Sequence, residues 1–190
     1  MDPDLPLIEA IQTGDDSALN ELIDRHREPL RRFVFRYLRN EAATEDVVQE
    51  TFVRVYFKAG KFQPKSSVKT WVYAIALNLC RDQFRRLARH RGDVSMDAPA
   101  RPDAPRTDVA DRAPSPSTRA ADSDRFAQLQ SAIDALPDKL KEALILFSIE
   151  ERSQHDVAEI LGITPKAVET RVYHARTKLR AALSSHSGVE

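Results

Sequence analysis

Cysteine, glycine and clustered histidine are all scarce in this 190-residue sequence, and each shortage excludes a class of chemistry. The single Cys80 excludes an internal disulfide and a cysteine-based zinc site, so the sequence predicts a reducing compartment. Only five glycines are present, and none belongs to a phosphate-cradling motif. The histidines are scattered and lack neighbouring pairs of carboxylates: His26, His90, His155, His174 and His186. We therefore predict no catalysis, no metal site and no cofactor.

Long hydrophobic runs and a net charge are also missing. No uninterrupted apolar segment is long enough for a bilayer span, and the N-terminus lacks the regions of a signal peptide. The sequence therefore predicts a cytoplasmic protein without membrane insertion. The net charge of zero conceals a segregation of sign: residues 1–53 hold 12 acidic and 6 basic residues, and residues 54–91 hold 10 basic and 1 acidic. This pattern indicates an acidic contact surface beside a surface for a polyanion.

The most informative stretch is residues 153–183, where two helical segments are joined by a tight turn. Gly162 follows the first segment at the position where a helix end favours a left-handed residue. Thr164 is a good N-cap, and Pro165 stands at the first helical position, where its missing N–H costs nothing. The stretch therefore predicts a helix-turn-helix, which binds DNA by placing its second helix in the major groove.

The second of these helices has one apolar and one polar face. Apolar residues recur at helical spacing: Val168, Val172, Ala175, Leu179 and Ala182. The opposite face carries the candidate DNA contacts, with basic residues on its flanks: Lys166, Glu169, Thr170, Arg171, Tyr173, His174, Arg176 and Thr177. The alternative interpretation is a solvated amphipathic helix in a bundle. The glycine and the capped turn favour DNA binding.

The N-terminal third predicts three helices, over residues 5–12, 15–39 and 40–60, with Pro29 kinking the second. In the third helix Val48, Phe52 and Val55 form the inward stripe. Its outer side carries an acidic, hydrogen-bonding face at i, i+3 and i+4 spacing: Asp46, Gln49 and Glu50. On spacing alone, a solvated helix flank is the favoured explanation of this face.

Residues 61–91 predict a polar loop over 63–69 and then a helix that is apolar nearly all round as far as Cys80. Lysines alternate with Phe62, Trp71 and Tyr73 in this segment, which is the composition of a single-strand groove, with cations for phosphates and rings for bases. The alternative is that these aromatic residues belong to the core, where we also place Cys80 and Phe84.

The composition changes completely over residues 92–122, which contain five of the eleven prolines and almost no large apolar residue. This composition predicts a flexible linker. Beyond it, a second domain of four helices is expected over 123–184, with an apolar face formed by Phe126, Leu129, Ile133 and Leu136 on its first helix. The fold class is therefore all-α, with one helical domain over 1–91 and another over 123–184.

Three motifs, in this order, resemble the extracytoplasmic-function (ECF) sigma factors of the sigma-70 family. EDVVQETF at 45–52 resembles the signature of region 2 that binds core polymerase. KFQPKSSVKTWVYAIALNLCRD at 61–82 resembles the promoter-melting segment. LPDKLKEALILFSIEERSQHDVAEILGITPKAVETRVYHARTKLR at 136–180 resembles region 4, which binds the minus-35 element.

The resemblance implies a dissociable specificity subunit of bacterial RNA polymerase. It assigns Asp46, Gln49 and Glu50 to core polymerase binding. It assigns to the minus-10 DNA, whose opening is driven by capture of a flipped base, Lys61, Phe62, Lys65, Ser66, Ser67, Lys69, Trp71 and Asn78. It assigns to the minus-35 DNA Lys166, Glu169, Thr170, Arg171, Tyr173 and His174.

Some departures from the family pattern narrow this interpretation. Glu169 stands where the family often has a basic residue, and a carboxylate accepts a hydrogen bond from cytosine N4, which indicates a different promoter preference. A region 3 is missing, and the tail over 184–190 is too short for a regulatory domain, so we expect an anti-sigma factor as a partner and a monomer when free. The alternative functions are a stand-alone dimeric helix-turn-helix regulator, a nucleic-acid enzyme and a decoy that titrates an anti-sigma factor.

Overall fold

The structure is a computed structural model that describes residues 2–93 and 116–186. These residues are predominantly helical and contain no strand. The N-terminal half comprises α1 (Leu5–Gln12), α2 (Asp16–Leu38), α3 (Glu41–Lys58), the 3-10 turn η1 (Ala59–Lys61) and α4 (Val68–Asp93). The C-terminal half comprises α5 (Pro116–Asp134), α6 (Asp138–Leu144), the π-helical segment η2 (Ile145–Ile149), α7 (Gln154–Leu161) and α8 (Pro165–His186). Across these two described ranges, no helix combines the length and the apolar character that crossing a membrane requires.

Local capping signals explain most of the helix boundaries. Asp15 caps α2 by accepting a hydrogen bond from the Ser17 amide. Asn40 caps α3 by accepting from the Ala43 amide. Arg39, between these two helices, adopts a left-handed conformation with φ 54°. The sharp reversal at this residue lets α2 and α3 pack side by side.

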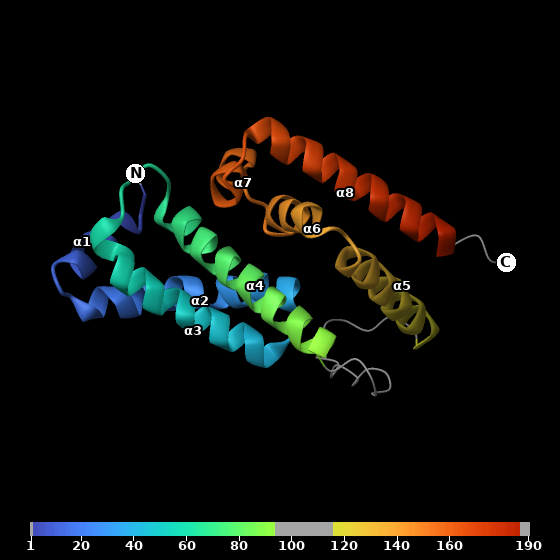
Figure 1. Ribbon diagram of the computed structural model, residues 1–190, viewed down its shortest axis with the longest axis horizontal. Helices are drawn as coiled ribbons and strands as arrows, with labels where there is room; N and C mark the ends of the chain where they lie inside the picture. Colours follow the sequence, from blue (N-terminus) through green and yellow to red (C-terminus); the bar gives the residue numbers. More distant parts are fainter. Residues whose placement is uncertain (1, 94–115, 187–190) are drawn as a thin grey trace.

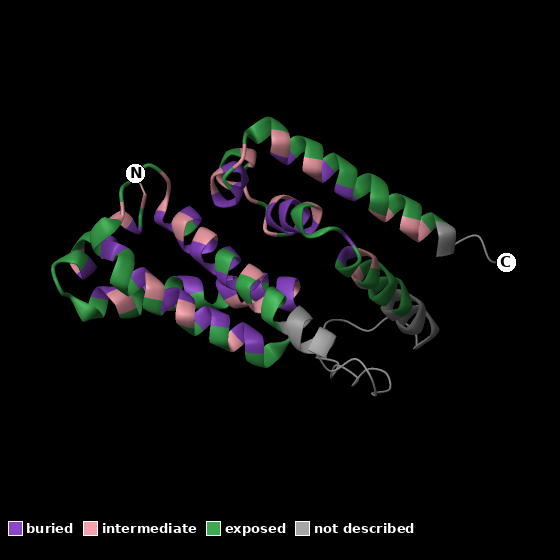
Figure 2. Cartoon of the chain, in the orientation of Figure 1, coloured by how far each residue is buried: buried purple, intermediate pink, exposed green. Residues whose placement is uncertain are grey.

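Helix α4 lies at the centre of the molecule, with α2 and α3 on one side and α7 on the other (Figure 1). It is buried nearly all round over its first half, as its sequence predicts: Val72, Tyr73, Ala76, Leu77 and Cys80 are each 0% exposed. In Figure 2 the buried positions of α4 are accordingly concentrated in its first half. Burial raises the pKa of the Cys80 thiol well above its ordinary value, so this residue is an inert core group.

Tyr73 belongs to the core, as the alternative interpretation of its segment predicts, because its ring is fully buried against Phe33. Two other expectations about the core are wrong. Phe84 is 41% exposed, and it stacks edge-on against Tyr37 without entering the core. On α5 the expected apolar face is only half covered: Ile133 and Leu136 are buried, whereas Phe126 and Leu129 remain exposed.

The domain limits expected at 91 and 123 differ from the helix limits. Helix α4 continues to Asp93, and α5 begins at Pro116 instead of Ser123. The expected linker over 92–122 therefore contributes residues to both helices, and its central part, 94–115, lies outside the described residues. The domain division remains a prediction.

The N-terminal and C-terminal halves pack against each other. One continuous apolar core joins residues of α2 and α4 to residues of η2, α7 and α8, among them Ile145, Leu146 and Val157. A second, smaller core lies between α5, α6 and α8, around Ile133 and Ala175. Helix α8 covers the outer side of α6 and α7, away from α4 (Figure 1).

Candidate nucleic-acid interface

The acidic face predicted on the third helix is present on the outer side of α3. Asp46 and Gln49 are exposed, and Glu50 is half-buried, with its Oε1 accepting a hydrogen bond from Arg54 Nε at 2.8 Å. We call Asp46, Gln49 and Glu50 the α3 acidic face. Within the described residues, Glu50 alone of the three holds an ion pair, and that pair lies at the surface, so the charge of this face is available to a partner.

A polar groove of about 570 Å³ separates the α3 acidic face from the end of α4. Its far wall consists of α4 residues that sequence reasoning did not select: Leu79, Asp82, Gln83 and Arg86. Asp82 therefore adds a third carboxylate, opposite the two of the α3 acidic face, and Arg85 donates to it at 2.6 Å. The spacing within one helix cannot show that two helices meet in this way.

The loop before α4 is held by hydrogen bonds to its polar groups. Ser67 caps α4, because its Oγ accepts from the Thr70 amide at 3.1 Å. The Val68 amide donates to Asp2 at 2.6 Å, which ties the N-terminal segment to the same loop. Helix α4 therefore begins at Val68, and Lys69, which was expected in the loop, lies in its first turn.

The predicted minus-10 residues lie between the end of η1 and the first half of α4. The rings of Phe62 and Trp71 pack together with their centroids 4.8 Å apart, and both are half-buried. The remaining residues are exposed or half-buried around them: Lys61, Lys65, Ser66, Ser67, Lys69 and Asn78. Burial, followed by the nearby Arg152, lowers the pKa of Lys69, so this lysine lies close to the C-terminal half.

The helix-turn-helix has the geometry that its sequence predicts. Ser153 caps α7, and Gly162 ends it in the left-handed conformation with φ 65°. Thr164 then accepts from the Ala167 amide at 3.2 Å, which starts α8. Gln154 joins the two helices by donating to the Pro165 carbonyl at 2.7 Å. These bonds fix the angle at which α8 leaves the turn.

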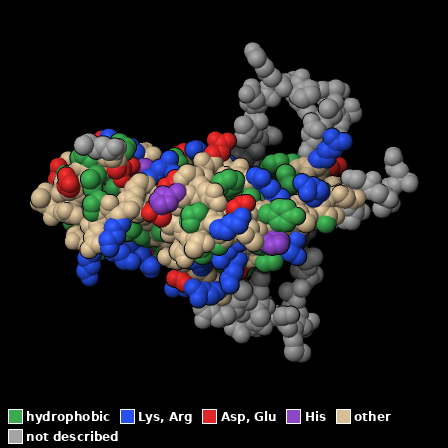
Figure 3. All heavy atoms as spheres, turned by 90° about the horizontal axis from the view of Figure 1, so that it is seen from above, with side chains coloured by type: hydrophobic (Ala, Val, Ile, Leu, Met, Phe, Trp, Pro, Cys, Tyr) green, Lys and Arg blue, Asp and Glu red, His purple; other side chains and the backbone are tan. Residues whose placement is uncertain are grey.

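The outer face of α8 carries the predicted minus-35 residues. Lys166, Glu169, Thr170, Tyr173 and His174 are exposed, and Arg171 is half-buried. In Figure 3, which views the molecule from the α8 side, Lys and Arg side chains are spread over the face, between hydrophobic and histidine side chains. This mixture of cations and rings is suited to phosphates and base edges.

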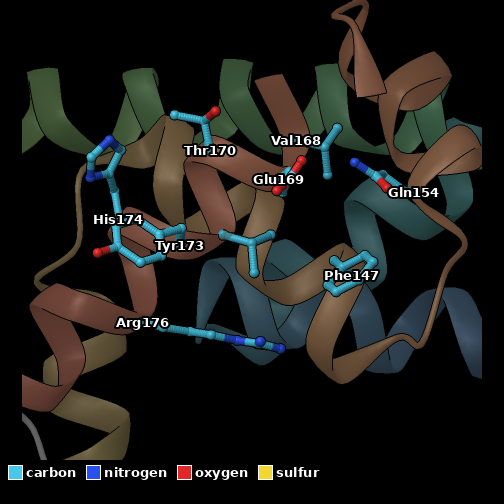
Figure 4. A pocket seen from close by; sticks show the side chains of 9 residues that line it. Phe147, Gln154, Val168, Glu169, Thr170, Tyr173, His174 and Arg176 are labelled. Atoms are coloured by element: carbon cyan, nitrogen blue, oxygen red, sulfur yellow. The ribbon is translucent and has the colours of Figure 1, made fainter. Parts of the chain in front are cut away.

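A shallow apolar pocket of about 600 Å³ lies beside this face (Figure 4). Phe147 and Val168 line it from within, and Tyr173 and His174 stand at its rim with ring centroids 5.6 Å apart. Glu169 is not free at this surface, because Lys166 donates to it at 2.9 Å. The pair neutralises part of the repulsion that Glu169 would exert on a phosphate backbone.

Comparison with known families decides between the alternatives. The family model "Sigma-70 region 2" matches residues 22–90, and the model "Sigma-70, region 4" matches residues 126–179. The chain belongs to the ECF branch of the sigma-70 family. It is therefore an RNA polymerase sigma factor and not an enzyme, and a region 2 match is not expected of a dimeric helix-turn-helix regulator.

Relatives from distant bacteria support this family membership. The chain is 30% identical to the RNA polymerase sigma factor CnrH of Cupriavidus metallidurans over 98% of this chain and 97% of that one. It is 30% identical to the ECF sigma factor SigW of Bacillus subtilis, over 93% of this chain and 94% of that one. It is 34% identical to the ECF sigma factor SigE of Mycolicibacterium smegmatis, over 92% of this chain and 66% of the relative.

Two solved structures have the same fold. A structure of CnrH in complex with the cytosolic domain of CnrY matches with a TM-score of 0.69 and 28% identity, over 96% of this chain and 97% of that chain. The sigma factor RpoE of Bartonella quintana, in complex with the anti-sigma factor NepR, matches with a TM-score of 0.66 and 22% identity, over 87% and 96%. In both cases the match extends through both sigma regions of this chain.

Proposed function

We propose that this sigma factor binds core RNA polymerase through the α3 acidic face. The observation that carries the proposal is that Asp46, Gln49 and Glu50 project from α3 on the side away from the apolar core. The polar groove beside them adds Asp82 on its far wall, together with the cations Arg54 and Arg86. A basic helical surface on the polymerase fits this arrangement, since complementary charge steers docking and fixes its register.

The loop over 61–67 and the start of α4 form the proposed minus-10 surface. Lysines at 61, 65 and 69 supply phosphate contacts, and the packed rings of Phe62 and Trp71 supply an apolar platform beside them. Asn78 lies two helical turns beyond Trp71 on the same side of α4 and is exposed. Unstacking a base costs a few kcal/mol, which stacking and phosphate contacts on such a surface offset.

The outer face of α8 forms the proposed minus-35 surface. Its first turns present Lys166, Glu169 and Thr170, which enter the major groove when a helix-turn-helix docks. Arg171 lies on the flank, where a cation meets phosphate. Because Lys166 holds Glu169 at 2.9 Å, the two side chains read base edges together, with Glu169 accepting from cytosine.

The relatives support a proposal for the partners and the location. CnrH is bound to the cytosolic domain of CnrY, and RpoE is bound to the anti-sigma factor NepR. We propose that this chain also has an anti-sigma partner, that it is monomeric when free, and that it acts in the bacterial cytoplasm, where its polymerase is.

Transcription from a library of genomic fragments tests the whole proposal. Core polymerase with this chain is expected to start RNA synthesis at a set of positions that share two upstream elements. Core polymerase alone, and core with a variant in which Thr170 and Arg171 are alanine, are the controls. Start sites that do not change when the chain is added would refute the proposed function.

A further inference from the structure

The N-terminal segment holds both ends of the loop over 62–67, which joins η1 to α4 and belongs to the proposed minus-10 surface. We call it the minus-10 loop. Before its entry, Gln12 at the end of α1 donates from Nε2 to the Ala59 carbonyl at 2.9 Å, across 47 positions of the chain. At its exit, the Val68 amide donates to Asp2 Oδ2 at 2.6 Å, across 66 positions. Residues distant in the sequence therefore fix the loop at both ends.

These two hydrogen bonds lie next to the two aromatic rings of the proposed minus-10 surface. The Ala59 carbonyl that Gln12 holds also accepts from the Phe62 amide at 3.0 Å. Val68 is the first residue of α4, and Trp71 follows it after about one helical turn. The two rings pack together with their centroids 4.8 Å apart. The placement of this ring pair therefore depends on both bonds from the N-terminal segment.

A buried carboxylate anchors the N-terminal segment to α2. The Asp4 side chain is 6% exposed, and its Oδ2 lies 2.7 Å from Nε2 of the equally buried His26. Its Oδ1 accepts from Arg25 at 2.9 Å. The Asp4 amide in turn donates to Asp2 Oδ1 at 3.0 Å. A buried carboxylate keeps such bonds because leaving them unmade is costly, so Asp2 reaches α4 from a fixed point.

The two side chains that reach the loop are not core groups. Gln12 is exposed and Asp2 is half-buried, although α1 itself packs against α2 and η1 (Figure 1). One hydrogen bond has a small net effect on stability, so the fold should tolerate the loss of either bond. What each bond determines is the position of a backbone group at one end of the minus-10 loop.

The position of this loop matters because it is proposed to capture a base. Ordering a free loop costs conformational entropy for every residue that is fixed, and a loop ordered only on binding loses that amount of affinity. A capture surface also requires its rings and cations within about 0.5 Å of their working positions. In this protein the N-terminal segment orders the ends of the loop before DNA arrives.

We propose that Asp2 and Gln12 are positioning residues for promoter opening, which hold the minus-10 loop ready to capture the opened strand. We call Asp2, Asp4, Gln12 and His26 the N-terminal bracket. Its members act through backbone groups of the loop and of α4, without touching DNA. The inference rests on the proposed function for its consequence, although the bracket itself can be measured without DNA.

Amide hydrogen exchange of the free, full-length chain tests the N-terminal bracket. Asp2→Leu keeps a branched side chain but removes the acceptor of the Val68 amide. Exchange of this amide is expected to accelerate about fivefold, the factor that one net hydrogen bond represents. Glu9→Met, which removes an exposed carboxylate from α1, is the matched control and should leave this exchange unchanged. Equal exchange in wild type and Asp2→Leu would overturn the bracket.

Transcription by the holoenzyme tests the positioning of the loop. The templates are a duplex promoter found among the genomic fragments and the same promoter with its minus-10 element unpaired by mismatches. We expect Asp2→Leu and Gln12→Met each to reduce transcription from the duplex about fivefold. Transcription from the mismatched promoter should stay near the wild-type rate, because its strands are already separated. Affinity for core polymerase should not change.

The sign of the charge change strengthens this test. Removing the negative charge of Asp2 favours phosphate binding, so a loss of transcription in Asp2→Leu is not a charge effect. Wild-type transcription from the duplex by both variants would overturn the inference. Equal losses on the two templates, or a similar loss in Glu9→Met, would overturn it as well, because these results indicate a general loss of structure. A wild-type chain that starts transcription nowhere would instead refute the proposed function, while the exchange result still decides the bracket.

Discussion

We expect Glu50→Lys to weaken binding to core polymerase while leaving the protein folded. The Glu50 side chain lies on the outer surface of α3 and contributes little to the stability of the fold. Glu50 is half-buried on α3, and its hydrogen bond to Arg54, one helical turn away, is its only ion pair in the described residues. Exposed i,i+4 pairs contribute about 0.3–0.5 kcal/mol, and the new Lys–Arg repulsion costs a similar amount. The free energy of unfolding should fall by less than about 1 kcal/mol, a melting shift of roughly 2–4 °C or less.

Binding should respond far more strongly than folding. Truncating one partner of a buried interfacial charge pair costs about 2–5 kcal/mol, and a reversal adds repulsion to that loss. Since each 1.4 kcal/mol is tenfold, affinity for core polymerase should drop at least about thirtyfold. Titration of labelled core polymerase, together with thermal melting of the free chain, measures both quantities in one set of samples.

Glu41→Lys is the matched control for this prediction. Glu41 lies on the same helix with the same charge, but nine residues away it points to the opposite side of α3, where it pairs with Arg31. It should therefore change stability slightly and leave affinity for core polymerase unchanged. Unaltered affinity in Glu50→Lys, or an equal loss in Glu41→Lys, would refute the assignment of the α3 acidic face.

Three further predictions concern α8, the turn of the helix-turn-helix, and the buried Tyr37 hydroxyl and Cys80 thiol. Arg171→Ala should weaken binding of the holoenzyme to every minus-35 sequence and reduce the salt slope by about 1, whereas Thr170→Val should change sequence preference, as competition between duplexes would show. Gly162→Ala should lower stability by about 1–2 kcal/mol in urea unfolding, because φ is 65° there, although a Cβ would meet nothing within 4 Å. Burial raises the pKa of both Tyr37 and Cys80, so the unfolded chain loses these protons first as pH rises. Stability should hold below about pH 8.5 and then fall by up to about 1.4 kcal/mol per pH unit for each group, which unfolding at a series of pH values measures.

The local structure of this protein was readable from its sequence. The first helix, Leu5–Gln12, has the predicted bounds, and Gly162 and Thr164 cap their helices as predicted. These features depend on residues at most a few positions apart, so periodicity and capping chemistry suffice to find them. The residues proposed to contact DNA and polymerase were assigned through the resemblance to the ECF sigma factors, because helical spacing alone does not distinguish a binding face from a solvated one.

The contacts between helices were not readable. The buried Glu142 carboxylate on α6 accepts hydrogen bonds from Arg81 on α4, 61 positions away, and from Tyr37 on α2, 105 positions away, and nothing in the local pattern of these residues indicates that they meet. Phe84 and Phe126 failed as core residues for the same reason, since helical spacing shows which residues share a face but not whether another element covers it. The sequence by itself determined the helices, their caps and the faces that carry charge. Only the tertiary structure decided that region 4 folds back onto α4, because the burial of one carboxylate depends on three helices meeting at one point.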